Sequence, residues 1–323
     1  MSDLGYLSSA CYGKDAVRVF RAVREGSTHT VFEYNVKVLL EGDIEVSYTD
    51  ADNRVTVVTD RIKNITYARI YSSKVSPHIL VPERFAEHLG THIVSKYTHI
   101  NKTFVDIEQL RWSRIVVGKD RKPHPHSFFR DGDEKRTVKV KIDGTAGKDK
   151  IQARISAGVN DLLVLKSSGS SFTSFIRDEY TRLKGVDDRI FSTSVDQNYT
   201  FAPFSISPPK DENKLDIVIP ALDQAEAGSV WDATVLDRAR TITLEVFAED
   251  ESASVQATLY KMGQRIIAEN AGVQTVSYAL PNKHYIPVDM SYMGVDNLTP
   301  AKAEVFQPVA APSGLTSATV SRK

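Results

Sequence analysis

The sequence has little that would direct the protein to a membrane, a polyanion or an oxidising compartment. Cys11 is the one cysteine among 323 residues, which excludes an intramolecular disulfide and is typical of a reducing compartment. The 41 Lys and Arg residues balance the 41 Asp and Glu residues, so no net field favours nucleic acid, an anionic membrane or an acidic partner. No run of about 18 apolar residues is present, and residues 1–5 lack the features of a signal peptide, so neither a membrane-spanning nor a secreted protein is expected.

The composition that remains, 41% hydrophobic and 25% charged, predicts a soluble globular protein of about two domains. Apolar and polar positions alternate at 16–24 and 30–40, which predicts two strands joined by a turn at Gly26 and Ser27. After Pro82, apolar residues recur every four positions and predict an amphipathic helix; they are Phe85, Leu89 and Ile93. Further strands are expected at 115–117, 127–129 and 136–142, before a polar break at 143–148.

The second half of the sequence repeats this plan. Strands are predicted at 161–165, 190–195 and 275–279, a helical region at 230–250, and a helix with an apolar stripe of Val255, Leu259, Met262 and Ile266. Residues 59–66 and 236–243 share an Asp-Arg pair. The repeated order predicts an α+β fold of two duplicated domains, 8–148 and 149–312, with a C-terminal tail at 313–323. The segment 207–213 is expected to be a polar surface loop.

One candidate reactive segment follows the strand predicted at 275–279. If the chain stays extended beyond Pro281, Asn282 and His284 point to one face and Lys283 to the other. That face would carry a proton carrier beside an uncharged polar side chain. The alternative is a solvated strand end without chemical function.

Other polar segments have competing interpretations. Lys14 follows Gly13 at the start of a strand and is either a site residue or an ordinary surface lysine. Thr59 and Asp60 suit either a helix N-cap or an anion site. The segment 167–171 is rich in serine but lacks the Gly-Lys-Ser/Thr ending of a P-loop, so a flexible turn is favoured.

His124 and His126 lie two residues apart, as metal-binding histidines on a strand can. Glu134 lies eight residues beyond His126, whereas a cupin-type iron site needs its carboxylate about four residues beyond the second histidine. A buried, hydrogen-bonded histidine pair is therefore favoured over a metal site.

Taken together, these segments resemble the urate oxidase (uricase) family, from Tyr12 to about Val320. The matching segments are Tyr-Gly-Lys-Asp at 12–15, Thr-Asp-Arg-Ile-Lys-Asn at 59–64, His-Pro-His-Ser-Phe at 124–128, Phe-Ile-Arg-Asp-Glu-Tyr-Thr at 175–181, Asp-Arg-Ile at 188–190, Ser-Ala-Ser-Val-Gln-Ala-Thr at 252–258 and Leu-Pro-Asn-Lys-His-Tyr at 280–285. The resemblance implies two tandem T-fold domains, each an antiparallel sheet with two helices on one face, in a barrel-like homotetramer. It further implies oxidation of urate by O2 to 5-hydroxyisourate and hydrogen peroxide, without a metal or organic cofactor.

The resemblance also implies a purine clamp shared between subunits. Phe172 would stack on the purine, and Arg189 would hold its edge through two parallel N–H groups. The Gln256 amide and the Val255 backbone would complete the polar rim. Thr59 and Asp60 would come from a neighbouring subunit.

For the chemistry, the resemblance implies a proton acceptor rather than a nucleophile, because urate must become electron-rich before O2 can take an electron from it. Lys14 would accept the proton, with the Thr59 hydroxyl as relay and His284 as its extension. Asn282 would hold O2 or the attacking water above the purine without adding charge. Lys283 has no role in this scheme.

Two departures from the family pattern stand out. Thr173 and Ser174 replace the Trp-Gly or Tyr-Gly of many members, which predicts a less bulky pocket rim. The chain ends in Ser321-Arg322-Lys323 rather than a peroxisomal Ser-Lys-Leu. A peroxisomal location with a missing tail is expected, and a cytoplasmic one if the signal is truly absent. Two rival functions remain at this point: a metal-dependent oxygenase using His124 and His126, and a purine-binding T-fold protein without catalysis.

Overall fold

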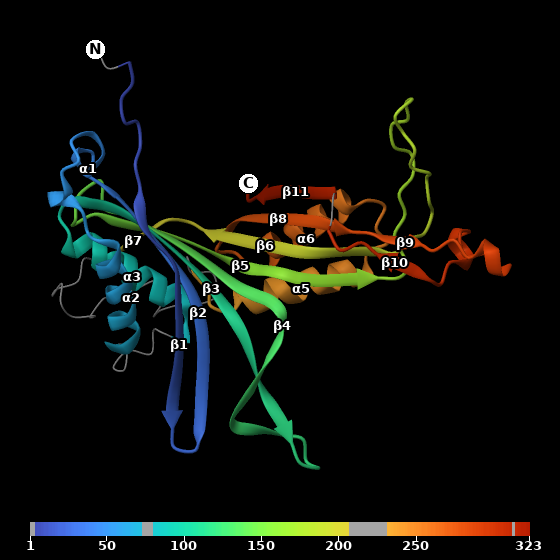
Figure 1. Ribbon diagram of the computed structural model, residues 1–323, viewed down its shortest axis with the longest axis horizontal. Helices are drawn as coiled ribbons and strands as arrows, with labels where there is room; N and C mark the ends of the chain where they lie inside the picture. The colour runs from blue at the N-terminus through green and yellow to red at the C-terminus, as the bar shows by residue number, and fades with distance from the viewer. Residues whose placement is uncertain (1–3, 73–79, 207–230, 312–313) are drawn as a thin grey trace. The chain divides into compact units, whose positions relative to one another are not determined.

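The computed structural model describes residues 4–72, 80–206, 231–311 and 314–323 (Figure 1). The chain forms two compact units, the first of Met1–Ala157 with Thr200–Asp232 and the second of Gly158–Tyr199 with Ala233–Lys323. Strands β5 (Ile151–Lys166) and β6 (Phe191–Phe201) each run through both units. The two units are thus interleaved in sequence. The boundary predicted from the sequence near residue 148 instead divides the chain once, into two duplicated domains, and that division stays a prediction.

The sheet of the first unit is built from long antiparallel strands. Its order is β1 (Tyr12–Glu25), β2 (Thr28–Gly42), β3 (Ile100–Val117), β4 (Lys122–Asp143) and the first part of β5, with β7 (Phe204–Ile206) also paired to β5. The predicted hairpin is confirmed, because Glu25 faces Thr28 across a turn in which Gly26 has a φ of 61°. The short strands predicted at 115–117, 127–129 and 136–142 are parts of the longer β3 and β4.

The helices of the first unit are α1 (Val46–Thr49), the short 3-10 turn η1 (Asn53–Val55), α2 (Thr59–Ser72) and α3 (Pro82–Lys96). Helix α3 begins at Pro82, where the missing N–H of proline costs no helical hydrogen bond. Phe85, Leu89 and Ile93 are buried, as the four-residue spacing predicts, and α3 packs on β3 and β4. Helix α2 packs on β1, which places the helix that begins at Thr59 against the strand that carries Lys14.

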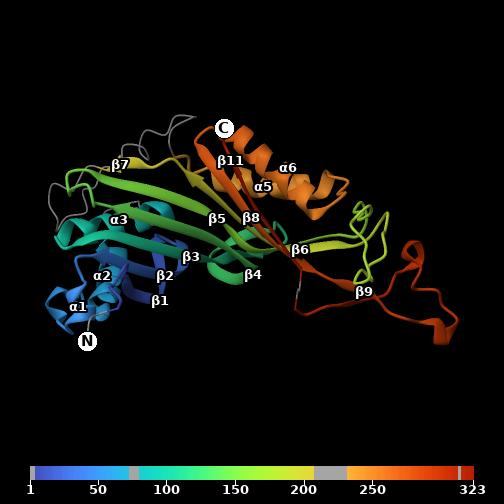
Figure 2. The same cartoon turned by 90° about the horizontal axis from the view of Figure 1, so that it is seen from above.

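The sheet of the second unit continues with the latter part of β5, then β6, β8 (Val273–Lys283) and β11 (Gly314–Ser321). Helices α5 (Val235–Glu249) and α6 (Val255–Glu269) pack on each other, and α6 packs on β8 and β11 (Figure 2). Within the expected C-terminal tail at 313–323, residues 314–321 form β11, which pairs with β8 from Gly314 opposite Asn282 to Ser321 opposite Thr275. The remaining elements are β9 (Tyr285–Pro287), β10 (Phe306–Pro308), η3 (Ser291–Met293) and η4 (Pro300–Lys302).

The core of the second unit follows the predicted helical stripe. Leu259, Met262 and Ile266 of α6 are buried against the sheet. The buried Thr243 of α5 shares a hydrogen bond of 2.7 Å with the Tyr278 hydroxyl, and burial raises the pKa of that phenol. The α+β prediction is confirmed, although α5 begins at Val235 rather than near residue 230. The predicted loop at 207–213 lies outside the described residues, and no helix within them is long and apolar enough to cross a bilayer.

Candidate active site

Phe172 and Arg189 lie together in the irregular segment between β5 and β6 of the second unit. The Phe172 N–H donates to the Val186 carbonyl at 2.8 Å, and the Val186 N–H donates back to Phe172 at 3.1 Å. The Arg189 guanidinium lies over the Phe172 ring, with its Cζ 5.0 Å from the ring centroid. The structure thus brings together the predicted stacking ring and the predicted edge-binding cation.

Arg189 is half-buried, and no carboxylate pairs with it in the described part of the chain. Its Nε is buried without a hydrogen-bond partner there, and burial lowers the pKa of the guanidinium. A desolvated cation with an unused donor favours a planar anion that accepts parallel hydrogen bonds.

The serine-rich segment beside Arg189 is held in place rather than being a flexible turn. Asp188 accepts hydrogen bonds from the Ser168 hydroxyl at 2.6 Å, the Gly169 N–H at 2.8 Å and the Ser170 N–H at 3.3 Å. The hydrogen bond from Ser168, followed by those from the backbone, holds the Asp188 pKa below its usual value. The Arg189 N–H in turn donates to the Ser170 carbonyl at 2.8 Å. Asp188 therefore ties this segment to the backbone that carries Arg189.

The same segment holds the start of helix α6. The Ser171 N–H donates to the Ser252 carbonyl at 2.8 Å, and the Ser252 N–H donates to the Gly169 carbonyl at 3.0 Å. Ser254 caps the helix by accepting from the Ala257 N–H at 3.1 Å.

Val255 and Gln256 are consequently the first two residues of α6, where backbone N–H groups have no partner inside the helix. Both side chains remain at least partly accessible. The positive end of the helix dipole lies at this position, which favours an anion. The segment that leads into Val255 and Gln256 is hydrogen-bonded, through Ser252, to the backbone just before Phe172. This arrangement is the one that the predicted purine clamp requires.

Replacing Asp188 with Asn is expected to lower the stability of the chain by about 1 kcal/mol at neutral pH, since one acceptor oxygen and the charge are lost at an exposed position. Because the folded-state pKa of Asp188 is depressed, its contribution is present above the unfolded value and is lost as pH falls through the folded pKa. The difference between wild type and Asp188→Asn should therefore shrink below about pH 4.

Thermal unfolding from pH 7 down to pH 3 measures this difference. Asp187→Asn is the matched control, because its exposed neighbour Asp187 makes no hydrogen bond among the described residues. A difference that stays constant over this pH range would contradict the role given to the Asp188 carboxylate.

Asn282 and His284 lie at the end of β8, beside β11. Both are half-buried, and β8 ends at Lys283, so His284 follows the strand directly. A Cβ atom placed on Gly314 would lie 3.5 Å from Asn282 Cβ and 4.0 Å from His284 Nε2. Both side chains therefore border the space above Gly314, as expected for residues on one face of an extended chain.

Lys14, Thr59 and Asp60 lie in the first unit. The Val57 N–H donates to the Tyr12 hydroxyl at 2.7 Å, which fixes the chain entering α2 against the start of β1. The Asp60 carboxylate binds Lys63 at 2.6 Å, and this hydrogen bond and charge lower its pKa, with a smaller contribution from the charge of Lys14.

Thr59 is the first residue of α2 and is exposed, and no hydrogen bond joins it to Lys14 in the described part of the chain. Lys14 therefore lies near the start of α2, while its link to Thr59 and to His284 stays a prediction.

The backbone around Lys14 is unusual. A Cβ atom at Gly13 would lie 1.8 Å from the Val38 carbonyl oxygen, so only glycine fits there. The pairing of β1 with β2 shifts between Lys14 and Val17, and Ala16 in this bulge has a φ of 56°. Bulges redirect side chains next to functional sites, and a left-handed alanine is a strained position. These features fix the direction in which Lys14 leaves the sheet.

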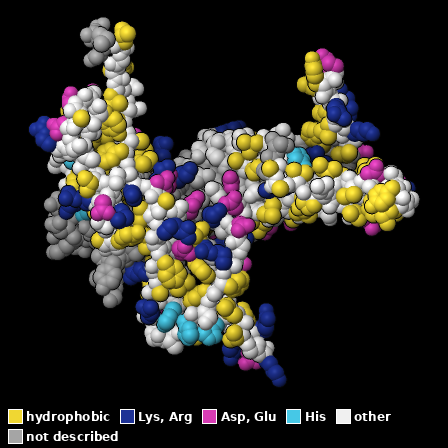
Figure 3. All heavy atoms as spheres, in the orientation of Figure 1, with side chains coloured by type: hydrophobic (Ala, Val, Ile, Leu, Met, Phe, Trp, Pro, Cys, Tyr) yellow, Lys and Arg dark blue, Asp and Glu magenta, His cyan; other side chains and the backbone are white. Residues whose placement is uncertain are grey.

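The prediction that His124 and His126 form a buried pair was wrong, because neither side chain is buried. His124 is half-buried and His126 is exposed, with ring centroids 4.5 Å apart, and His29 of β2 lies 5.5 Å from His126. Figure 3 shows histidine side chains gathered at the surface of the first unit. Within the described ranges, no group of His, Cys, Asp or Glu side chains has the arrangement of a metal site. The geometry therefore gives the metal alternative no support.

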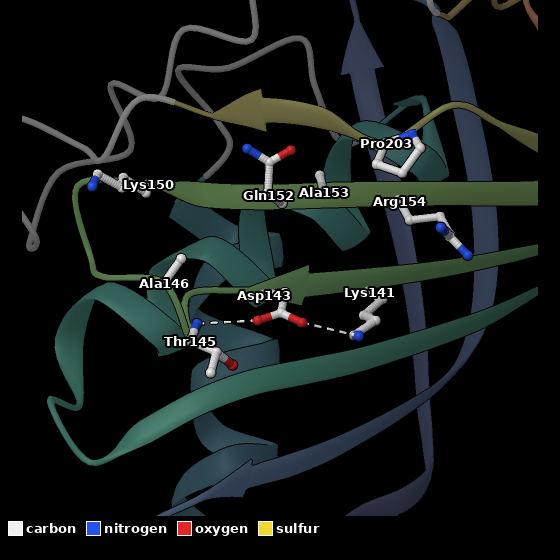
Figure 4. Close-up of a pocket in the computed structure, with 9 residues that line it drawn as sticks. All are labelled: Lys141, Asp143, Thr145, Ala146, Lys150, Gln152, Ala153, Arg154 and Pro203. Atoms are coloured by element: carbon white, nitrogen blue, oxygen red, sulfur yellow. Dashed lines mark hydrogen bonds and ion pairs between the residues drawn. The ribbon is translucent and has the colours of Figure 1, made fainter.

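A hollow of about 520 Å³ opens on the first unit, between the ends of β4 and β5 (Figure 4). Its lining includes Lys150 and Arg154 together with Asp143, which accepts from the Thr145 N–H at 3.0 Å and pairs with Lys141 at 3.0 Å. None of the predicted site residues lines it. This hollow is therefore separate from the candidate site.

Sequence reasoning missed the residues that hold the site together. Ser254 had a readable signal, because a serine directly before an apolar helical stripe is typical of an N-cap. The bond from Val57 to the Tyr12 hydroxyl and the three bonds to Asp188 join residues far apart in sequence, and no local pattern indicates them.

Comparison with known proteins gives this arrangement its context. The family profile described as Uricase matches residues 10–141 and 155–317. Over 319 residues the sequence is 45% identical to the uricase of Aspergillus flavus, covering 98% of this chain and 97% of that protein. The chain belongs to the uricase family. It is also 40% identical over 326 residues to the uricase of Schizosaccharomyces pombe, with 100% of each covered.

A solved structure of the uricase family agrees with the fold. The crystal structure of uricase from Arthrobacter globiformis aligns with a TM-score of 0.79 at 31% identity, covering 99% of this chain and 96% of that chain. The fold is thus that of a uricase, with two T-fold-like halves, as the resemblance implies.

Proposed function

We propose that the protein catalyses the oxidation of urate by O2 and water to 5-hydroxyisourate and hydrogen peroxide. The observation that carries this proposal is the half-buried Arg189, which lies over Phe172 with an unused donor. Membership of the uricase family names the purine anion that this arrangement suits. The reaction balances with one O2 and one water consumed for each urate, and two electrons pass from urate to O2.

In the proposed complex the purine stacks on Phe172 and Arg189 binds its edge through parallel N–H groups. The Val255 N–H and the Gln256 amide complete the rim at the start of α6, where the helix dipole favours the anion. Thr59 and Asp60 of a neighbouring subunit close the site in a homotetramer. The exposed position of both residues on this chain is consistent with a contact made by another copy.

In the proposed mechanism Lys14 takes a proton from urate, and the Thr59 hydroxyl and His284 relay it. The electron-rich anion then passes electrons to O2, which becomes hydrogen peroxide after gaining two protons. Asn282 holds first O2 and then the attacking water, which adds to the oxidised purine. Support comes from the shared surroundings of Asn282 and His284 above Gly314.

The deciding experiment mixes the purified protein with urate in air-saturated buffer and follows the urate absorbance and peroxide together. We expect one peroxide for each urate lost, with no change after a strong chelator is added. Binding of urate without its loss would instead identify a purine-binding protein. Loss of activity with chelator would favour a metal-dependent oxygenase at His124 and His126, and either result would overturn the proposal.

Replacing Gly314 with Val is expected to lower kcat by on the order of tenfold to a hundredfold, because the branched side chain fills the space that Asn282 and His284 border. Thermal unfolding should change little, since position 314 is exposed and at the end of β11. Steady-state kinetics measures the effect. Leu315→Val is the matched control, because Leu315 is 68% exposed and lies opposite Pro281. An unchanged kcat in Gly314→Val would remove Asn282 and His284 from the mechanism.

A further inference from the structure

A second aromatic ring lies against the predicted stacking ring. The Phe172 and Phe175 ring centroids are 4.9 Å apart and the ring planes differ by 15°. The Arg177 guanidinium lies over Phe175, with its Cζ 4.8 Å from that centroid. Together with Arg189 over Phe172 at 5.0 Å, these groups form one stack, which we call the arginine–phenylalanine stack. Its order is Arg189, Phe172, Phe175 and Arg177.

The two neighbours of Phe172 must lie on opposite faces of its ring. Each lies about 5 Å from the same centroid, and a ring face has room for one planar group at that separation. For a purine to stack on Phe172, the Arg189 guanidinium, which lies over the ring here, must move to the purine edge and so free that face. Phe175 therefore backs the opposite face of Phe172, away from the purine.

The backbone between the two rings is bent to make this contact. Ser174 has a φ of 57°, a left-handed conformation that a residue with a side chain adopts at a cost. This bend returns the chain so that Phe175 faces Phe172 three residues away. A strained backbone position between two stacked rings favours a functional role for the ring contact.

Arg177 closes the far end of the stack against the rest of the segment. A Cβ atom at Gly185 would lie 3.6 Å from the Arg177 guanidinium, 3.7 Å from the Thr173 methyl group and 3.8 Å from the Phe172 carbonyl oxygen. Gly185 precedes Val186, whose backbone pairs with Phe172 through two hydrogen bonds. The Arg177 end of the stack therefore lies close to Gly185, beside the backbone pairing that carries Phe172.

We infer that Phe175 is a positioning residue that fixes the Phe172 ring before substrate arrives, an inference that rests on the proposed function. Phe172 is half-exposed, and without a backing ring its side chain would lose freedom only when the purine binds. Because Phe175 packs against Phe172, the Phe172 side chain loses its conformational freedom when the protein folds. The purine then binds to a ring that is already ordered, and binding no longer carries that entropy cost. The effect falls on binding and not on the proton or electron transfer steps.

The experiment measures urate binding without O2, where no turnover occurs, and then steady-state kinetics in air. Phe175→Ala should raise the urate Kd and KM by about three- to tenfold, with kcat at saturating urate within about twofold of wild type. Phe175→Tyr should restore wild-type binding because it keeps the ring. Phe175→Leu should not, because it keeps the apolar volume without the ring. Phe129→Ala is the control, since Phe129 is a 46% exposed phenylalanine of the first unit.

A pair of variants at Ser174 tests the same inference if Phe175→Ala does not fold. Ser174→Gly relieves the strain and should leave urate Kd unchanged, whereas Ser174→Val disfavours the left-handed backbone and should weaken binding as Phe175→Ala does. Equal binding in Phe175→Leu and wild type, or in Ser174→Val and wild type, would overturn the inference. If the wild-type chain neither binds nor oxidises urate, the proposed function fails instead, so the two failures are distinguishable.

Discussion

Lys14→Met is expected to lower kcat for urate oxidation by about a hundredfold or more while changing the urate KM little, since general acid–base groups typically contribute that much to turnover. Methionine keeps the length and apolar stem of lysine but cannot accept a proton. Lys14 lies at a strand bulge beside the start of α2, and its charge reaches Asp60. In the proposed complex the purine is held mainly by Phe172, Arg189 and the start of α6 in the second unit, so its binding should depend little on Lys14.

Steady-state kinetics together with anaerobic urate titration separates these two effects. Lys37→Met is the matched control, because Lys37 is a half-buried lysine on the neighbouring strand β2 that has no place in the proposed mechanism. Equal losses of binding and turnover in Lys14→Met would show that Lys14 holds the substrate rather than moving its proton. A normal kcat would remove Lys14 from the chemistry.

Arg189→Ala should damage both binding and turnover, raising KM by about a hundredfold and lowering kcat by tenfold or more. Two charge-assisted hydrogen bonds to the purine edge would be lost, each worth about 1.5–3 kcal/mol, and the purine would no longer be held in register over Phe172. Arg189→Lys should recover only part of the loss, because an ammonium keeps the charge without the planar fork.

The same kinetic measurements, run with Arg182→Ala as control, test this prediction. Arg182 is an exposed arginine of the same irregular segment and makes no ion pair among the described residues. If Arg189→Lys equals wild type, the guanidinium geometry is irrelevant and the clamp is wrong. If Arg189→Ala binds urate normally, Arg189 does not hold the purine, and the position of Arg189 over Phe172 no longer supports the proposed function.

The elements with strong periodicity could be predicted from the sequence. The alternation at 16–24 and 30–40 and the four-residue spacing of Phe85, Leu89 and Ile93 reflect faces that are buried on one side. Strand β11 was missed for the same physical reason. Val320 is its one buried residue, so it shows little alternation between apolar and polar positions. Charged residues, such as Arg130 bound to Glu33 at 2.8 Å, likewise obscured the full length of β4, which was predicted only as two short strands.

The residues of the candidate site were named from family resemblance, and their spacing alone could not have assembled them. Phe172 and Arg189 meet because Val186 and Ser170 pair with their backbones, and Ser252 brings the start of α6 to the same place. Each of these bonds joins residues well separated in the chain. Phe175 is different, since a ring three residues from Phe172 across a turn is a local signal that sequence reading could use.

The interleaving of the two compact units has a consequence for synthesis on the ribosome. The first unit includes Thr200–Asp232, so a nascent chain that has emerged only to residue 157 lacks part of it. In the second unit β8 pairs with β11, which follows it in sequence, so this edge of β8 stays unpaired until Gly314–Ser321 have been synthesised. Neither unit can therefore finish folding from its first continuous segment alone, and unpaired strand edges persist while the later segments are made. Production of either unit as one continuous fragment should give aggregation-prone material.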